Sequence, residues 1–143
     1  MIVRRTVIAA LCALALPFFA HAQAAFPQPG KPVRVIVAFP PGIGVDAQAR
    51  AVTPKLAEIL GVPVVIENKP GGGTLLAAQE VMRAAPDGHT IFYSASSTMA
   101  QVPHTLKAAN FDPMTDFTPI TIGAKGPLVV VVNAQLPIKD AKE

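Results

Sequence analysis

The stretch "PPGIGVD", Pro40 to Asp46, has the residue types and the spacing of an anion-binding turn. It follows an apolar run, leads into a helical pattern and fits the form Gly42-x-Gly44-x-x-Ala47. In the dinucleotide fingerprint such glycines let backbone N–H groups approach a pyrophosphate, and Glu67 lies about where a ribose-binding acid is expected. The turn therefore predicts binding of a nucleotide or of another anion.

Two further polar loops follow later strand patterns: "NKPGGGT", Asn68 to Thr74, and "SASSTM", Ser94 to Met99. In an open parallel sheet the carboxyl ends of the strands share one edge, and ligands bind there. Glycine turns and helix starts at that edge present N–H groups that suit a carboxylate or a phosphate. The glycines of the second loop also fit a plain turn, and the hydroxyls of the third also fit local capping of the backbone.

Asp46 and the two histidines of the mature chain favour binding over catalysis. A carboxylate aimed at a bound anion would be repulsive, so we expect Asp46 to cap its helix by accepting from the N–H of Gln48 or Ala49. His89 and His104 have no paired carboxylate at a ligand-like spacing, and no Gly-x-Ser-x-Gly, His-Glu-x-x-His or Walker pattern is present. The sequence predicts no catalytic residue, no metal site, no cofactor and no enzyme activity.

The loops require a scaffold of alternating strands and helices. We predict strands at Val33–Phe39, Val62–Glu67 and His89–Ala95, and helices at Val45–Leu60 and Leu75–Ala85. Apolar strands joined by right-handed crossovers imply a parallel sheet with helices on both faces. The predicted fold class is α/β.

The first helix has a clear apolar pattern with one interruption. Gly61 is the expected C-terminal stop, and Pro54 cannot donate a hydrogen bond to the carbonyl of Arg50. This predicts a kink, the alternative being a restart capped by Thr53. The predicted core face consists of Val45, Ala49, Val52, Leu56, Ile59 and Leu60.

The last third of the sequence has less regular patterns. We predict a strand at Phe117–Ile122, a glycine-rich break at Gly123–Gly126 and a strand at Leu128–Val132, with Asp140 as a helix cap. A strand as apolar as Leu128–Val132 needs cover on both faces, and the sequence supplies little of it. Exposed edges of this kind favour association.

The first 22 residues have the pattern of a secretory signal peptide. Arg4 and Arg5 precede an apolar run too short to span a bilayer, and cleavage is expected after Ala22, or after Ala24 in a second Ala-x-Ala pattern. Cleavage removes Cys12, the only cysteine, so disulfides, a cysteine nucleophile and thiolate metal sites are not expected. It also lowers the formal net charge from +3 to +1, which argues against nucleic acid as a partner.

Four stretches of the predicted mature chain occur together: "PVRVIVAFPPGxGxDxxAR", "LGVPVVIENKPGGG", "AAPDGHTIF" and "FDPMTDFTPI". With these stretches the chain resembles the solute-binding proteins of tripartite tricarboxylate transporters, the Bug family of periplasmic receptors. The resemblance implies a type II periplasmic binding protein with two α/β lobes that close over a ligand. Residues 1–22 would be the signal peptide, residues 23–123 most of the first lobe and residues 124–143 the start of an incomplete second lobe.

The resemblance also implies which residues contact the ligand and which partner receives it. In the family, backbone amides and hydroxyls of the loops hold ligand carboxylates, often through bridging water. Carried over to this sequence, the ligand-contacting set is Phe39, Pro41, Gly42, Ile43, Gly44, Gly72, Gly73, Ser96, Ser97 and Thr98, with Asp46 beside it. The implied ligand is a di- or tricarboxylate, an amino acid or an aromatic acid, passed to the membrane permease subunits of the transporter.

The sequence departs from the family pattern at Ile43, Thr74 and Ala77, where the family usually has glycine or another small residue. The shape of the loops, and the ligand they admit, depend on these positions. Two alternatives stay open. The chain is a truncated fragment that binds nothing, or it is a dinucleotide-binding oxidoreductase domain that uses the first loop.

Overall fold

The computed structural model describes residues 26–127, 129 and 131–136. Its centre is a three-stranded parallel sheet made of β1 (Val33–Val37), β2 (Val64–Asn68) and β3 (Thr90–Tyr93), in the order β2-β1-β3. The predicted parallel sheet and the α/β class are confirmed. The strands are one or two residues shorter at most ends, and β2 ends one residue later than predicted. The predicted signal peptide, both cleavage sites and the Asp140 cap lie outside the described residues.

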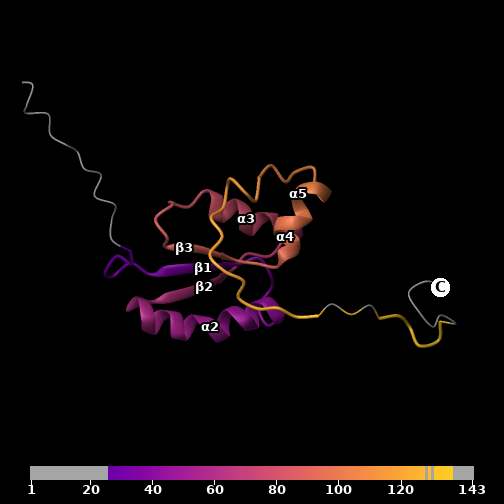
Figure 1. Cartoon of the computed structure of the whole chain (residues 1–143), viewed down its shortest axis with the longest axis horizontal. Coiled ribbons are helices and arrows are strands. Elements are labelled where there is room, and N and C mark those ends of the chain that lie inside the picture. Colours follow the sequence, from indigo (N-terminus) through magenta and orange to yellow (C-terminus); the bar gives the residue numbers. More distant parts are fainter. Residues whose placement is uncertain (1–25, 128, 130, 137–143) are drawn as a thin grey trace, which may run out of the picture.

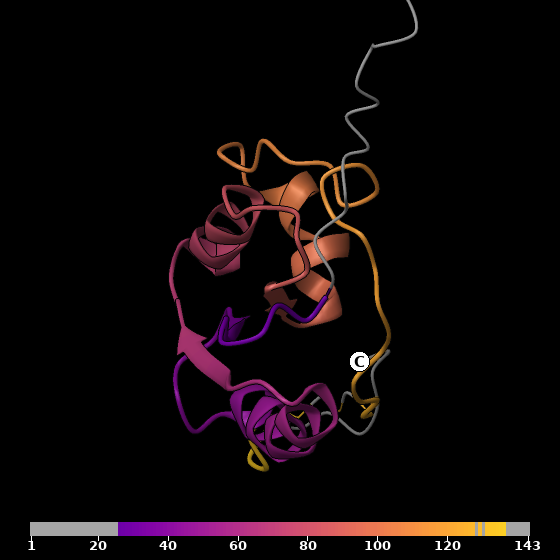
Figure 2. The same cartoon turned by 90° about the vertical axis from the view of Figure 1, so that its left-hand side faces the viewer.

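Helices cover both faces of the sheet (Figures 1 and 2). The long helix α2 (Gly44–Leu60) packs on one face. The short 3-10 turn η1 (Gly72–Thr74) and helix α3 (Leu75–Met82) lie on the other, on the same side as α4 (Ser96–Ala100) and α5 (Val102–Thr105).

Successive residues of β1 supply the two halves of the core. Val35 and Val37 cluster with Ala49 of α2, whereas Ile36 clusters with Ala77 of α3. Because both faces of the central strand are covered, β1 has to be apolar on both sides, and this is what made it recognisable from sequence. The predicted helix after the second loop ends at Met82, three residues before the expected Ala85.

Helix α2 runs unbroken through Pro54, so the alternative of a restart at Thr53 is wrong. It ends at Gly61, as predicted, where φ is 68° and the Gly61 N–H donates to the carbonyl of Ala57. The predicted core face is only partly correct, because Val52 and Ile59 are 46% and 70% exposed. Val52 lies one residue before the buried Thr53, which is about 100° further around the helix. A pattern of spacings of three and four does not distinguish such neighbouring positions.

The predicted strand Phe117–Ile122 does not form. Phe117 is an aromatic anchor that packs on Phe92 and Phe111, while Ile120 and Ile122 are 76% and 69% exposed. Pro119 removes one ladder donor, and within the described residues this segment pairs with no strand.

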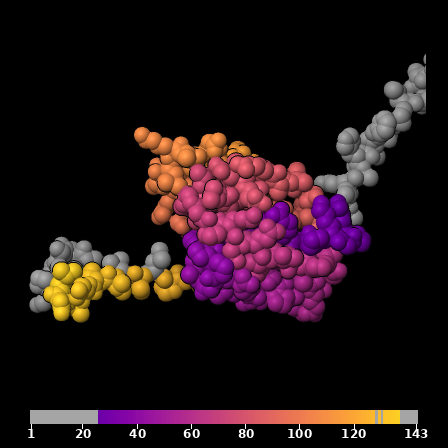
Figure 3. Space-filling model, turned by 180° about the vertical axis from the view of Figure 1, so that it is seen from behind, coloured from indigo at the N-terminus to yellow at the C-terminus, as the bar shows by residue number. Residues whose placement is uncertain are grey.

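The segment predicted as the strand Leu128–Val132 is described at residues 129, 131 and 132, and none of these is in a strand. All three side chains are more than half exposed, and the yellow end of the chain leads away from the body in Figure 3. Over the described part of the chain, we find no helix with the length and apolar character needed to cross a membrane.

Candidate functional site

The three predicted loops meet at one edge of the sheet, as expected. They follow Val37, Asn68 and Tyr93, the last residues of three parallel strands, and so leave the sheet at the same end. In Figure 1 this is the end at which α4 lies. The geometry of each loop decides which polar groups it offers to a ligand.

The Asp46 carboxylate is turned into the protein, with the residue 1% exposed. It accepts hydrogen bonds of 2.8 Å from the Gly42 N–H, from Arg50 Nε and from Asn68 Nδ2. The predicted cap on Gln48 or Ala49 is therefore wrong. Asp46 is the third residue of α2, where the Cβ points back toward the helix start, so its carboxylate reaches the preceding turn instead.

These three donors keep Asp46 ionised. The hydrogen bond from Arg50 lowers the pKa of Asp46 most, and those from Gly42 and Asn68 lower it further. Together they hold the pKa of Asp46 well below its usual range. The same contact with Asp46 raises the pKa of Arg50. The result is an internally neutralised ion pair directly beneath the first loop.

Asn68 connects the first two loops. Its Nδ2 donates to Asp46 and, at 2.9 Å, to the carbonyl of Phe39, while its Oδ1 accepts from Arg50 Nη2 at 3.2 Å. The neighbouring Lys69 N–H donates to the carbonyl of Val37 at 2.8 Å. The first loop is thereby fastened to the end of β2.

The first turn of α2 has four N–H groups that donate to no acceptor within the described residues: those of Ile43, Gly44, Val45 and Asp46. Ala47 is the first residue whose N–H is taken, by the carbonyl of Ile43 at 3.0 Å. The Gly42 N–H, in contrast, is occupied by Asp46. Open donors at the positive end of a 17-residue helix form a favourable place for an anion.

The second loop has a backbone that requires glycine whether or not a ligand binds. Gly71, Gly72 and Gly73 all have positive φ, and a Cβ at Gly71 would lie 2.8 Å from the Leu76 side chain. Thr74, the next residue, also has a positive φ, of 80°, and its buried Oγ1 has no hydrogen-bond partner in the described structure. The N–H groups of Gly72 and Gly73 are without acceptors there, so their ligand role stays a prediction.

In the third loop Ser96 is exposed and Ser97 is partly buried. Thr98 is fully buried, and its hydroxyl lies 2.6 Å from that of Ser94. Its N–H donates to the carbonyl of Ala95, whereas those of Ser96 and Ser97 have no acceptor among the described residues. Thr98 thus orients this loop, and its direct contact with a ligand stays a prediction.

Sequence reasoning missed Arg50 and Asn68 as parts of the site. Arg50 follows Asp46 by four residues on a predicted helix, a spacing that brings two side chains together, so a signal existed. Asn68 closes a strand directly before a glycine loop, but its partner Asp46 is 22 residues away and nothing local points to it.

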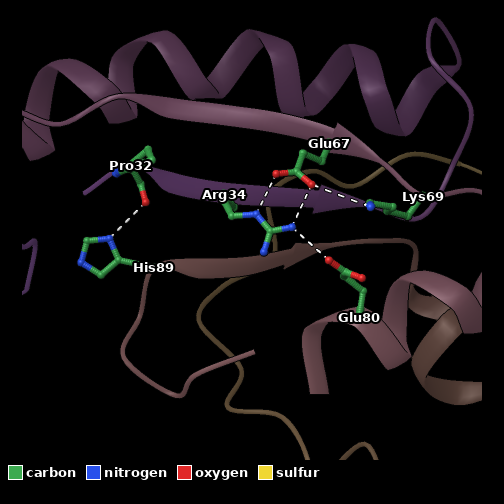
Figure 4. Close-up of polar contacts among 6 residues, drawn as sticks. All are labelled: Pro32, Arg34, Glu67, Lys69, Glu80 and His89. Carbon is green, nitrogen blue, oxygen red and sulfur yellow. Dashed lines mark hydrogen bonds and ion pairs between the residues drawn. The ribbon is translucent and has the colours of Figure 1, made fainter. Parts of the chain in front are cut away.

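Glu67, the acid that a dinucleotide site would use, is held by Arg34 on the α3 side of the sheet (Figure 4). Arg34 donates to both carboxylate oxygens of Glu67 at 2.7 and 2.8 Å, and also to Glu80 at 3.0 Å. The hydrogen bond from Arg34 lowers the pKa of Glu67, and the two carboxylates raise that of Arg34. Glu67 is therefore engaged in a structural ion pair, which weakens the dinucleotide alternative.

His89 is a buried residue whose ring contacts the backbone. It is 3% exposed, its Nε2 accepts from the Gln28 N–H at 3.1 Å, and its Nδ1 lies 3.2 Å from the carbonyl of Pro32 (Figure 4). These contacts lie at the amino end of the strands, away from the three loops. Within residues 26–136 as described, no group of three or more histidine, acidic or cysteine side chains is placed to hold a metal.

A hollow of about 600 Å³ lies beside α4 and α5, outside the predicted set of ligand-contacting residues. Its walls are largely apolar: Met99, Ala100, Pro103, His104, Phe111, Asp112, Pro113 and Met114.

Comparison with known proteins places this geometry in a family. Residues 48–143 match the family model described as the tripartite tricarboxylate transporter family receptor. A relative from Cupriavidus necator, the UPF0065 protein in the gbd 5' region, is 38% identical over 99% of this chain and 43% of its own length. The chain spans between 34% and 43% of the length of the curated relatives it matches.

Two solved structures resemble the described fold. MatC from Rhodopseudomonas palustris, with bound malate, is 39% identical with a TM-score of 0.61 and covers 64% of this chain and 31% of its own. The periplasmic binding protein BugD is 33% identical with a TM-score of 0.59 and covers 65% of this chain and 31% of its own.

Proposed function

Because this chain belongs to the tripartite tricarboxylate transporter receptor family, we propose that it contributes the carboxylate-contacting loops of a periplasmic solute receptor. The observation that carries the proposal is the row of N–H groups from Ile43 to Val45, at the start of α2, that have no acceptor within the described residues. Amide donors at a helix start bind a carboxylate without a formal positive charge, and the nearby Arg50 is engaged with Asp46 and Asn68.

The proposed ligand is a small carboxylate of the di- or tricarboxylate, amino acid or aromatic acid class. The malate bound in MatC makes a short dicarboxylate the first candidate. One carboxylate would sit on the first turn of α2, with Ser96 and Ser97 donating from the third loop. Gly72 and Gly73 would complete the rim.

The wider setting is proposed on the family match. The segment 1–22 would export the chain, residues 23–123 would form most of the first lobe, and residues 124–143 would begin the second. The receptor would then pass its ligand to the membrane permease subunits of the transporter. Catalysis and a cofactor have no part in this proposal.

Gly44 allows a direct test of the amide site. Gly44→Pro removes one open N–H at the first position of a helix, where proline fits, and Ile43 before it has the extended conformation that proline requires, with φ of −86° and ψ of 165°. A Cβ at Gly44 meets no atom within 4 Å, so Gly44→Ala is a matched control that keeps the N–H. Both variants should fold.

The assay is a malate titration followed by amide NMR shifts, which detects weak binding and identifies the amides involved. Shifts should be confined to the loop amides, and Gly44→Pro should lower affinity by about tenfold or more, the effect of one hydrogen bond to a charged group. Gly44→Ala should bind like the native chain. The proposal would be contradicted if none of malate, succinate, citrate, aspartate and benzoate shifted these amides, or if the two variants bound equally well. In a separate titration, quenching of NADH fluorescence by the chain would favour the dinucleotide alternative.

A further inference from the structure

We propose that Asn68, with the Asp46–Arg50 ion pair, is the positioning element of this site: it fixes the first loop on the end of β2 and makes no contact with the ligand itself. The inference rests on the proposed function, since it concerns how the open N–H groups of α2 are held in place.

The hydrogen bonds of Asn68 span three separate segments. Nδ2 reaches the carbonyl of Phe39 in the first loop and Oδ1 of Asp46 in α2, while Oδ1 accepts from Arg50 one turn further along the helix. Asp46 in turn holds the Gly42 N–H at the apex of the loop. A displacement at the end of β2 would therefore move both ends of the first loop.

The amide group of Asn68 suits this role because it both donates and accepts. Asn68 Nδ2 lies 2.8 Å from Asp46 Oδ1 and 2.9 Å from the Phe39 carbonyl oxygen. A carboxylate oxygen at the same place has no proton to donate, so it would be repelled by both acceptors. Asn68→Asp keeps the shape of the side chain and reverses these two contacts. It is the most specific variant for the proposal.

The arrangement also explains why an acid can lie beneath an anion site. Asp46 is 1% exposed, and its oxygens face Gly42, Asn68 and Arg50, so its charge is offset inside the protein. The N–H groups of Ile43, Gly44 and Val45 have no acceptor within the described residues and are not used by this carboxylate. If the carboxylate were released from these donors, it would compete with the ligand for the same amides.

A matched control exists on the α3 face of the sheet. Arg34 makes three side-chain hydrogen bonds, to Glu67 and Glu80, and Asn68 also takes part in three. Arg34 precedes the end of β1 by three residues, about 10 Å along the strand. Arg34→Met should therefore reduce stability without disturbing the first loop.

The experiment compares the native chain with Asn68→Asp, Asn68→Ala and Arg34→Met by malate titration, thermal unfolding and hydrogen exchange at Gly42. Both Asn68 variants should weaken malate binding by about tenfold or more and speed exchange at the Gly42 N–H, as expected when ligand-orienting contacts are lost. Arg34→Met should lower the unfolding temperature but leave malate affinity and Gly42 exchange unchanged. Equal effects of the Arg34 and Asn68 variants on binding would overturn the proposal.

Arg50 provides a second pair of variants in case the Asn68 variants do not fold. Its side chain is 54% exposed, so Arg50→Met should be tolerated, and Arg50→Lys retains a cation four residues from Asp46. Lysine should restore part of the malate affinity that methionine loses, and failure to do so would count against the inference. If the native chain binds no malate, the proposed function fails. Faster hydrogen exchange at the Gly42 N–H in the variants would still show that Asn68 and Arg50 hold the first loop in place.

Discussion

Thr74 is in a conformation that its side chain disfavours, and replacing it should stabilise the protein. It follows three glycines of positive φ and itself has φ of 80° and ψ of −4°. A β-branched residue in the left-handed region is a steric outlier. Its buried Oγ1 also lacks a hydrogen-bond partner in the described structure. Thr74→Gly removes both unfavourable features.

The expected gain follows from three contributions. The left-handed conformation costs an L-residue about 1–2 kcal/mol, and an unsatisfied buried hydroxyl costs about 1–3 kcal/mol. Glycine gives back about 0.5–1 kcal/mol because its unfolded chain has more freedom. Thr74→Gly should therefore raise the free energy of unfolding by about 1–2 kcal/mol, taking the lower ends because the substitution also removes the threonine methyl group.

Thr74→Ala separates the two causes, because it removes the hydroxyl but keeps the Cβ and hence the backbone strain. It should gain less than Thr74→Gly in urea unfolding. Thermal unfolding gives a second readout, since about 1 kcal/mol corresponds to about 4–8 °C in a domain of about 100 residues. If Thr74→Gly is no more stable than Thr74→Ala, backbone strain at this position is not significant and the reasoning is wrong.

Two further predictions concern the ion pair and the core. Acid should lower the free energy of unfolding, because the pKa of Asp46 is lower in the folded state than in the unfolded state. The stabilisation from Asp46 is fully present above about pH 4 and is lost as the pH falls through the folded-state pKa. Urea unfolding at a series of acidic pH values measures this dependence, and Asp46→Asn should make the free energy of unfolding depend less on pH. An equally steep dependence in Asp46→Asn would assign the effect to other carboxylates. In the core, Ile36→Ala should cost about 2–5 kcal/mol because Ile36 is fully buried, while Ile59→Ala, at 70% exposure, should change stability by less than about 0.5 kcal/mol. Equal losses by urea unfolding would contradict the assignment of the core.

The sheet and the positions of the three loops were predictable because their signals are local. Val35 to Val37 is apolar on both sides, and each strand leads into a glycine or serine loop. Once the strands are known to be parallel, their carboxyl ends must share an edge. The N–H groups of Ile43 and Gly44 could thus be expected at the site. The sequence did not indicate which of them would lack an acceptor within the protein.

What could not be predicted depends on contacts between distant residues. Asp46 was expected to cap its own helix, but its third partner, Asn68, is brought near only by the pairing of β1 with β2. The segment Phe117–Ile122 has the composition of a strand, yet composition does not supply a pairing partner. The strain at Thr74 had no signal beyond its departure from the small residue usual in the family.

The acidic side chains favour a carboxylate over a dinucleotide as the proposed ligand, since the glycine pattern fits either one. A ribose-binding acid must be free to accept from a hydroxyl, and Glu67 instead accepts two hydrogen bonds from Arg34. Asp46 is likewise saturated by three donors. With both acids occupied, neither carboxylate is free to accept from a ribose hydroxyl, and the N–H groups at the start of α2 complement a ligand with an acceptor-rich end, such as a small carboxylate.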